Sequence, residues 1–476
     1  MDLNKFPLFY NREPLIFIND FEKSKKGVLR KSKAFLDGID DVKLFSNKKN
    51  FRIEYDRFNI GQRNFGIGKQ IQNVKFDYAE KKIIFKSLFI DRCSSENTGG
   101  SVNQICSEGF SKSKRQYFKL VIPTSESLDL HFQIENVLFL NDSGNTSVVA
   151  TKINLEDDEI FILEDKDEFK NRYIIIESKK KQTYDEFSNK TFSIRVALGY
   201  VIGYFPGNKG YFFSYSNQKR EKFNNFYFST LREDIKTIMN PININAYTRL
   251  YERPKQAEKY YKSGILKKLK IKSFSFLCNK LLTDDNFLAT ILLIIESTKA
   301  SLIFRPGGYS IALETLSDVI IGNEKVKIAP ISSKRDFKEL RNELIEVLNK
   351  HSKKESYEDV NTLKVRLENL NQITNLESLK KPFSILNINL LDEDIKVIKS
   401  RNDFLHGRVP DFKNAGENRS IELKDYDLFY ASVRLYTLLN VLIFKMIGFD
   451  NYILNYPKIY EKDTKYKVKE ACYRKV

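Results

Sequence analysis

The hydrophobic periodicity of this sequence changes once along the chain, and that change constrains the fold more than any other feature. Residues 51–230 hold short aromatic and β-branched runs separated by Asn, Asp, Gly and Lys clusters, a pattern typical of strands. From residue 273 onward, apolar residues recur at helical spacing instead. The lysine-rich stretch 231–272 shows neither pattern and contains Pro241 and Pro254. The sequence therefore predicts an α+β protein, with a strand-rich mixed N-terminal domain followed by an all-α helical bundle.

Four segments follow from this change. We expect residues 1–235 to form the mixed domain, and residues 236–272 to form a basic connecting segment. Residues 273–450 are expected to form the helical domain. The remaining residues, 451–476, are polar and basic and are predicted to be a loosely ordered tail.

Within the N-terminal half, two segments deserve separate predictions. Apolar and polar residues alternate over residues 128–135, which predicts a half-buried strand with His131 on its solvated face. The apolar spacing of residues 184–203 fits both a helix and a strand, and we favour a helix. A turn at residues 206–208 and a strand over residues 210–216 are expected to follow it.

In the C-terminal half, four segments have helical spacing. Residues 287–303 are apolar nearly all round, as in a central helix, whereas residues 309–321 and 334–350 each carry one apolar face. Residues 425–447 are long and mostly apolar, and Gly448 is a suitable C-terminal cap.

The chain is strongly basic, with 80 Lys and Arg against 62 Asp and Glu and a net charge of +18. Such an excess favours a polyanion or an anionic surface as partner. A general richness in Lys, Asn and Ile explains the same excess without a polyanion. Lysine runs at residues 23–33, 179–181 and 262–272 are therefore read either as a polyanion track or as solvated surface.

Several classes of protein are disfavoured by composition. The four cysteines form no CxxC pair and only three histidines accompany them, so we expect no zinc site and no metal or other cofactor. No secretory signal pattern opens the chain. The longest apolar run, residues 287–295, is shorter than the ~18 residues that a membrane span needs. We therefore expect a cytoplasmic protein that does not enter a membrane.

The most informative segment is LLDEDIKVIKSRNDFLHGRVPD, residues 390–411, which is predicted as one helix. Its acidic start at residues 392–394 suits the positive end of a helix dipole, and Gly407 and Pro410 end it. The predicted buried stripe consists of Ile395, Ile398 and Leu405.

Three side chains of this segment could form a site. Asn402 and His406 are four residues apart and share a helix face, with His406 in the last turn. Arg401 lies roughly 140° round the helix from His406 at 100° per residue, so a second surface is expected to complete the site. The alternative is that Arg401 is a surface ion-pair partner and His406 a helix cap.

The stretch RNDFLHG, residues 401–407, resembles the R-x4–6-H motif of HEPN ribonucleases, in the form with Asn after Arg and Gly after His. The order of a mixed N-terminal domain and a helical C-terminal domain is similar to that of ApeA-like anti-phage proteins. GYVIGYFPGNKGYFFSY at residues 199–215 and SIALETL at residues 310–316 are also similar to that group. The resemblance covers about residues 275–450.

The resemblance implies an activity and a set of roles. HEPN enzymes cleave RNA without a divalent ion, using the ribose 2′-hydroxyl and leaving a 2′,3′-cyclic phosphate and a 5′-hydroxyl. Arg401 would stabilise charge at phosphorus, His406 would transfer protons, and Asn402 would assist. Arg408 is a candidate RNA-phosphate contact, or alternatively a surface charge.

The resemblance also implies that two HEPN domains pair around one cleft, and therefore that the chain forms a homodimer or a larger even assembly. Single-stranded or loop RNA, with tRNA among the candidates, is the expected substrate. Abortive infection against phage is the expected role, with the N-terminal domain sensing a phage-derived trigger. The alternatives are a catalytically inactive module that binds RNA or a protein partner, and a toxin partner whose activity lies elsewhere.

Other polar residues rank below this motif. Glu314 points away from the apolar face of its predicted helix, so it either lines a cleft or is solvated. Arg434 interrupts an apolar helix and is expected to be ion-paired or snorkelling. His351 has no Arg at a suitable spacing and is expected to be solvated.

Overall fold

The computed structural model divides the chain into two compact units. The sheet unit comprises Met1–Lys299, Ile447–Asn455 and Cys472–Lys475, and the helical unit comprises Ala300–Met446, Tyr456–Ala471 and Val476. The residues that the structure describes are 4–5, 11–30, 39–56, 67–78, 81–93, 97–128, 130, 133–140, 147–242, 259, 262–264, 266–322, 330–352, 359–371, 374–413 and 420–476.

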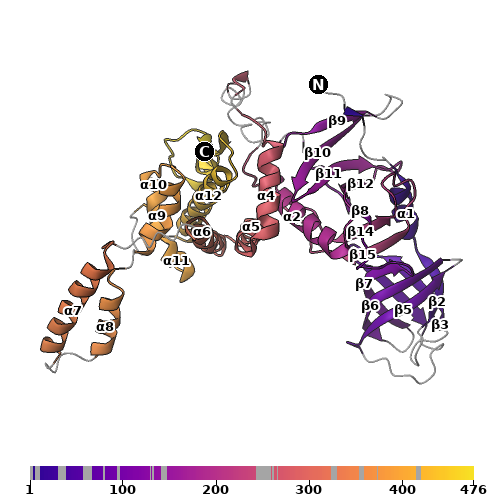
Figure 1. Cartoon of the computed structure of the whole chain (residues 1–476), viewed down its shortest axis with the longest axis horizontal. Coiled ribbons are helices and arrows are strands. Elements are labelled where there is room, and N and C mark those ends of the chain that lie inside the picture. Colours follow the sequence, from indigo (N-terminus) through magenta and orange to yellow (C-terminus); the bar gives the residue numbers. More distant parts are fainter. Residues whose placement is uncertain are drawn as a thin grey trace. The chain divides into compact units, whose positions relative to one another are not determined.

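The predicted class is confirmed, because strands dominate the first half of the chain and helices the second (Figure 1). The boundary between units lies after Lys299 and not at residue 272 as the periodicity predicts. Helices α4 (Ile271–Thr283) and α5 (Asp285–Lys299) pack on α2 (Tyr184–Ile202) of the sheet unit. Helical periodicity identifies the type of an element but not the surface on which it packs.

Six strands of the sheet unit close into an antiparallel barrel. Strand β7 pairs with both β4 and β6, and the order β7-β4-β3-β2-β5-β6 therefore returns to β7. The barrel strands are β2 (Lys25–Arg30), β3 (Ile39–Ser46), β4 (Phe51–Asp56), β5 (Gln70–Tyr78), β6 (Lys81–Cys93) and β7 (Asn97–Ser107).

Strand β7 also pairs with β15, so an open sheet continues from the barrel in the order β7-β15-β14-β8-β12-β11-β10-β9-β1. Only the β1–β9 pair is parallel among the described strands of this sheet. The strands are β1 (Asn4–Lys5), β8 (Tyr117–Thr124), β9 (Val137–Leu140), β10 (Ser147–Leu155), β11 (Asp158–Lys166), β12 (Arg172–Ser178), β14 (Lys209–Tyr215) and β15 (Asn225–Thr230). A separate short pair joins β13 (Tyr204–Phe205) to β16 (Ile235–Lys236).

One apolar core runs from the barrel into the open sheet. It holds the inward side chains of the barrel strands together with Phe213, Phe226 and Phe228. Helix α1 (Glu13–Phe21) adds Ile18 and Phe21 to this core. These buried aromatic side chains explain why so many Phe and Tyr residues occur in the N-terminal half.

The ambiguous segment at residues 184–203 is helical, as predicted, and forms α2. Thr183 and Glu186 make a capping box at its start, and Gly203, with φ of 78°, ends it in the left-handed region. The predicted turn and strand also follow, as β14 begins at Lys209.

The strand predicted over residues 128–135 is wrong. Leu128 lies outside any strand, Leu130 lies in a 3₁₀ turn, and Ile134 makes only an isolated bridge to Leu269. All three apolar side chains are nevertheless buried. The alternation of apolar and polar residues therefore indicated which side chains are buried, but it did not indicate a strand. His131 lies outside the described residues.

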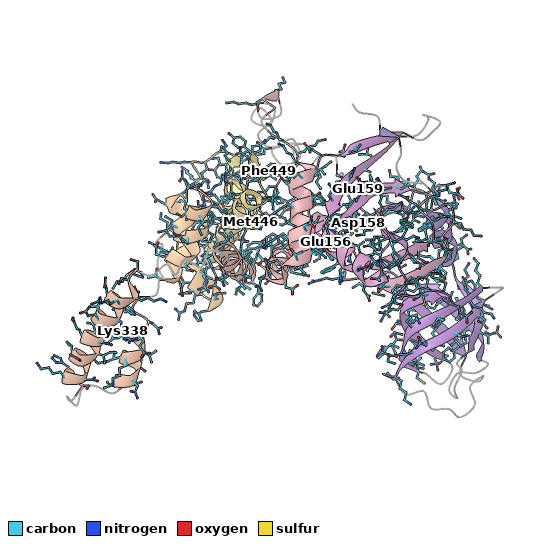
Figure 2. All side chains as sticks on the ribbon, viewed as in Figure 1. Glu156, Asp158, Glu159, Lys338, Met446 and Phe449 are labelled. Carbon is cyan, nitrogen blue, oxygen red and sulfur yellow. The ribbon has the colours of Figure 1, made fainter. Side chains whose placement is uncertain are left out.

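The helical unit is arranged around α12 (Ile421–Met446). Met446 at its end is labelled in Figure 2. Helices α6 and α10 pack on α12, and α9 and α11 pack on α6. The other helices are α6 (Arg305–Ile321), α7 (Lys334–His351), α8 (Val360–Glu368), α9 (Asn375–Ile385), α10 (Asp392–Lys399), α11 (Arg401–Leu405), α13 (Tyr456–Ile459) and α14 (Glu461–Thr464).

Among the described residues, only α12 is long and apolar enough to cross a membrane. Inside the fold, however, 94% of its apolar window is buried. A helix that faces lipid would expose these side chains, so α12 has the packing of a protein core helix.

The predicted loose tail is folded. Strand β17 (Tyr452–Leu454) pairs with β18 (Tyr473–Lys475), and both belong to the sheet unit. Tyr456, Val468 and Cys472 are buried. The high Lys content of the tail concealed the few apolar residues that anchor it.

Candidate functional site

The RNDFLHG segment begins a short helix of its own. Residues 390–411 do not form one helix, because α10 ends at Lys399 and α11 begins at Arg401. Ser400 separates them, with φ of −78° and ψ of 3°. The break changes the buried stripe, which consists of Asp394, Val397, Ile398 and Phe404. Of the three predicted stripe residues only Ile398 is buried, and Leu405 is 38% exposed.

Arg401 is held by two groups of the helical unit. Its guanidinium forms an ion pair with the Glu314 carboxylate on α6, and its Nη1 donates to Asn402 Oδ1 at 2.9 Å. The side chains of Arg401 and Glu314 are 14% and 34% exposed. Arg401 Nε has no acceptor among the described residues. The guanidinium is thus oriented at the surface, with one of its donors unsatisfied.

Packing of α11 on α6 brings these residues together. Gly307 on α6 lies next to Phe404, because a Cβ added at Gly307 would be 3.7 Å from the Phe404 carbonyl oxygen. Phe404 is buried in this contact region and anchors α11. Partial burial also lowers the pKa of the Arg401 guanidinium from its ordinary value.

His406 occupies the C-cap position of α11. Its side chain is exposed, and no described residue forms a hydrogen bond or ion pair with the imidazole. Gly407, with φ of 69°, turns the chain away, and the backbone N–H of Arg408 donates to Asp403 O at 2.7 Å. Arg408 is exposed at this turn.

The structure therefore joins two of the predicted site residues and leaves two open. Arg401 and Asn402 are in direct contact, whereas His406 and Arg408 face solvent without a described partner. Sequence reasoning considered Glu314 alone, as a possible cleft residue, and missed its pairing with Arg401. Its place off the apolar face of α6 was the available signal.

Apolar side chains are exposed on the same two helices. Phe304, at the start of α6, is 73% exposed, and Ile311, one heptad further, is 44% exposed. Leu405 on α11 is also exposed. The candidate site is therefore carried by helices that also present apolar surface.

A second arginine cluster lies behind α10, and sequence reasoning missed its full extent. Arg434 on α12 is buried, and it donates to Asp394 Oδ1 at 2.7 Å and to Glu470 Oε1 at 2.5 Å. Burial alone lowers the pKa of this guanidinium, but Tyr430, Asp394 and Glu470 outweigh that effect and raise it. The prediction of an ion-paired core arginine is confirmed.

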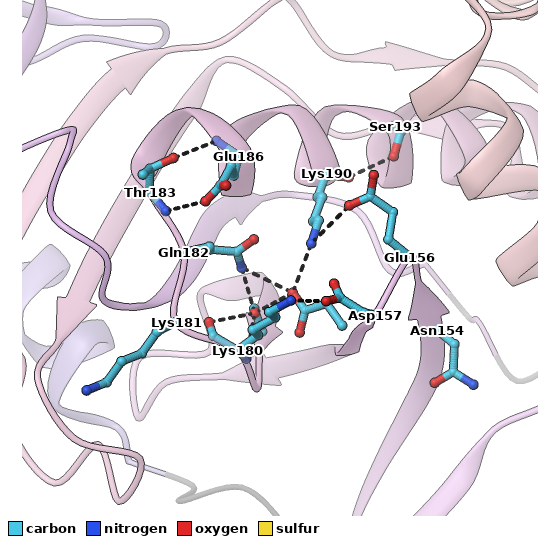
Figure 3. Close-up of polar contacts among 12 residues, drawn as sticks. Asn154, Glu156, Asp157, Lys180, Lys181, Gln182, Thr183, Glu186, Lys190 and Ser193 are labelled. Carbon is cyan, nitrogen blue, oxygen red and sulfur yellow. Dashed lines mark hydrogen bonds and ion pairs between the residues drawn. The ribbon is translucent and has the colours of Figure 1, made fainter.

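A polar hollow of about 220 Å³ lies under the start of α2 in the sheet unit. Gln182 and Lys190 line the hollow (Figure 3). Both contact Asp158, whose Oδ2 accepts from Gln182 Nε2 at 3.1 Å and lies 3.5 Å from the Lys190 ammonium. The same oxygen accepts from Ser178 Oγ at 2.6 Å. The ion pairs at the rim of the hollow are Arg115–Glu186, Lys180–Asp157 and Lys190–Glu156.

These pairs change the interpretation of one lysine run. Within residues 179–181, Lys179 pairs with Glu159, Lys180 pairs with Asp157, and Lys181 lies over the Tyr117 ring. Two of its three charges are therefore neutralised within the chain. This run fastens the β12–α2 connection to the neighbouring hairpin and is unsuited to be a polyanion track.

Comparison of the chain with protein-family models, with curated proteins and with solved structures finds no match. Among the described residues, no group of three or more His, Cys, Asp or Glu side chains is placed to hold a metal ion. What the site can do must therefore be argued from Arg401, Asn402, Glu314 and His406. Together they offer an oriented cation for an anionic oxygen and an accessible imidazole for proton transfer.

Proposed function

We propose that this chain is a metal-independent endoribonuclease of the HEPN type. The observation that carries the proposal is the joint placement of Arg401 and His406 on α11, a surface helix of the helical unit. The Arg401 guanidinium is oriented by Glu314 and Asn402, while the His406 imidazole remains accessible. The sheet unit would sense a phage-derived trigger in the cytoplasm, and the helical unit would cleave single-stranded or loop RNA.

The chemistry follows from these two side chains. An imidazole can take the proton from the ribose 2′-hydroxyl or deliver one to the leaving 5′-oxygen. A guanidinium can bind two phosphate oxygens and stabilise the charge that develops at phosphorus. Arg401 would meet the phosphate by exchanging part of its contact with Glu314, which is itself one-third exposed.

Pairing of two chains supports this mechanism. One chain carries one such motif, and His406 does not contact Arg401 through any hydrogen bond in the described residues. A second α11 facing the first would bring an imidazole and a guanidinium from two chains to one phosphate. The exposed apolar residues Phe304, Ile311 and Leu405 would become buried in such a pair.

The test is RNA cleavage by the purified full chain and its Arg401→Ala and His406→Ala variants, in the presence of EDTA. We expect wild type to leave 5′-hydroxyl and 2′,3′-cyclic phosphate ends, and each variant to lose about 10²–10⁴-fold in rate. Lys424→Ala, a partly exposed cation on α12, is the matched control and should retain activity. Undiminished cleavage by both site variants would refute the assignment.

A catalytically inactive RNA- or partner-binding module is the second candidate. The Arg401–Glu314 ion pair favours this candidate, because the guanidinium that would stabilise charge at phosphorus is already paired within the single chain. The same experiment separates the two functions. A binding module shifts RNA in a gel and leaves it intact, whereas a nuclease shortens it.

A further inference from the structure

Helices α7 and α8 pack side by side as a hairpin (Figure 1). Neither helix has a single buried residue, although α7 has 18 residues. The hairpin nevertheless carries exposed apolar side chains, including Leu340 at 38% and Val347 at 55% exposure on α7 and Val365 at 54% on α8. Two helices with so little burial have little packing to hold them, so a partner is expected to cover them.

One face of the hairpin forms an apolar groove of about 290 Å³. From α7 it is lined by Leu344, Val347, Leu348 and His351, and from α8 by Leu363, Arg366 and Leu367. On α7, Leu340, Leu344, Val347 and His351 are spaced by four, three and four residues. This is the spacing of a helix-packing seam in a coiled coil or four-helix bundle.

The charged residues beside the seam identify the occupant. Glu343 and Lys350 lie one heptad apart on α7, both exposed, on the same flank of the seam. Neither forms an ion pair or hydrogen bond with another described residue. Lys338, labelled in Figure 2, lies on the same helix and is equally unpaired among the described residues.

We infer that the α7–α8 hairpin binds the same hairpin of a second copy of this chain, antiparallel and across a two-fold axis. That arrangement places Leu344 against the second copy's Val347, and Leu340 against the second copy's His351. It also places Glu343 beside the second copy's Lys350, and symmetry repeats this pair. A parallel arrangement would instead place Glu343 beside the second copy's Leu348 and leave its charge without an opposite charge across the interface, so it is disfavoured.

This interface is separate from the pairing proposed for α11, because none of its residues belongs to α6 or α11. Its test therefore needs no nuclease activity. Full-length chain labelled with ¹⁵N is mixed with unlabelled chain, and a zero-length carbodiimide reagent couples carboxylates to contacting amines. We expect a cross-linked peptide that joins Glu343 of a ¹⁵N-labelled chain to Lys350 of an unlabelled chain, or the reverse.

Within one chain this link cannot form, because seven residues of helix separate the two side chains by about 10 Å. Absence of mixed-label peptides containing Glu343 or Lys350 would overturn the inference. A monomer at all concentrations tested by sedimentation would also overturn it, and would assign the groove to another partner.

Charge reversal gives the second arm of the test. Glu343→Lys and Lys350→Glu should each weaken self-association about tenfold, because each replaces two attractive pairs by two repulsive ones. The double variant should recover most of the affinity. Glu346→Lys is the matched control, since it lies roughly 100–160° round α7 from the seam residues and should have little effect. Failure of the double variant to recover, with both single variants weakened, would refute the Glu343–Lys350 contact.

Discussion

The helical unit contains two arginine–carboxylate clusters that use the same chemical groups in different surroundings. Arg434 is 1% exposed and bridges Asp394 of α10 and Glu470 of the C-terminal segment. Arg401 is 14% exposed and pairs with Glu314, whose carboxylate is one-third exposed. The first cluster joins three segments and leaves no room for a ligand, whereas the second lies at the surface beside an accessible imidazole.

This difference supports a structural role for the Arg434 cluster and the binding role that we propose for the Arg401 cluster. A buried charge is tolerated only when it is paired, so each member of the Arg434 cluster depends on the others. An exposed pair contributes little to stability and can be exchanged for another anion at little cost. A phosphate can therefore replace Glu314 at Arg401, but none can replace Asp394 at Arg434.

The largest expected effect is on stability and comes from the buried cluster. Arg434→Met should lower the free energy of unfolding by about 3–5 kcal/mol, because it removes the guanidinium that forms an ion pair with the buried Asp394 carboxylate. Arg401→Met, the matched control, should cost less than about 1 kcal/mol. Urea unfolding followed by circular dichroism measures both. Equal losses in the two variants would show that the clusters do not differ as proposed.

Alkaline pH should act on the buried cluster by a smaller amount. Burial raises the pKa of Tyr430, which lies against Arg434, from 10.0 to about 12. The folded state therefore keeps the phenol proton while the unfolded state loses it. This contribution is complete below pH 10 and is lost as the pH rises through about 12, a fall of about 2.7 kcal/mol.

Tyr430→Phe is the variant that checks this pH dependence. It should flatten the decline of the unfolding free energy between pH 10 and 12, measured by urea titration at each pH. The Arg401 cluster contains no tyrosine, so Arg401→Met should leave the decline as it is. If the unfolding free energy of Tyr430→Phe declines as steeply as that of wild type, the decline comes from other titrating groups.

The surface cluster should respond to removal of its carboxylate. The ligand for this test is a 2′-deoxy analogue of the RNA. Glu314→Gln should tighten its binding by about 3–10-fold, since the phosphate no longer competes with the Glu314 carboxylate for Arg401. Glu470→Gln, the equivalent change at the buried cluster, should leave RNA binding unchanged and lower stability instead. Fluorescence anisotropy measures the affinity. Weaker binding by Glu314→Gln would mean that Glu314 does not compete with the ligand, and that its orientation of Arg401 outweighs any competition.

The sequence predicted the order of strands and helices but not how distant segments meet. Local signals sufficed for α2, whose capping box and Gly203 mark its ends, and for α7, whose apolar face is regular. The barrel closure through β7 depends on pairings between segments far apart in the chain, and no local pattern encodes them. The folded C-terminal segment was missed for the same reason.

The candidate site shows the same limit. The motif at residues 401–407 could be found from spacing alone, and so could the exposed place of His406 at a helix end. The contact between Arg401 and Glu314 could not, because it depends on how α11 packs on α6. The break at Ser400 was also missed, since the residues on both sides favour a helix.

The smallest expected effect concerns Arg408, which extends the surface cluster. It is exposed just beyond His406, and among the described residues it has no ion-pair partner. A phosphate contact at this position would contribute mainly by counterion release. Arg408→Ala should therefore weaken RNA binding only a few-fold, and should reduce the slope of log affinity against log salt concentration by about one. Arg335→Ala, an exposed cation on α7, is the matched control and should leave the slope unchanged. If both variants reduce the slope equally, RNA is bound by the general positive charge of the chain and not by the surface around α11.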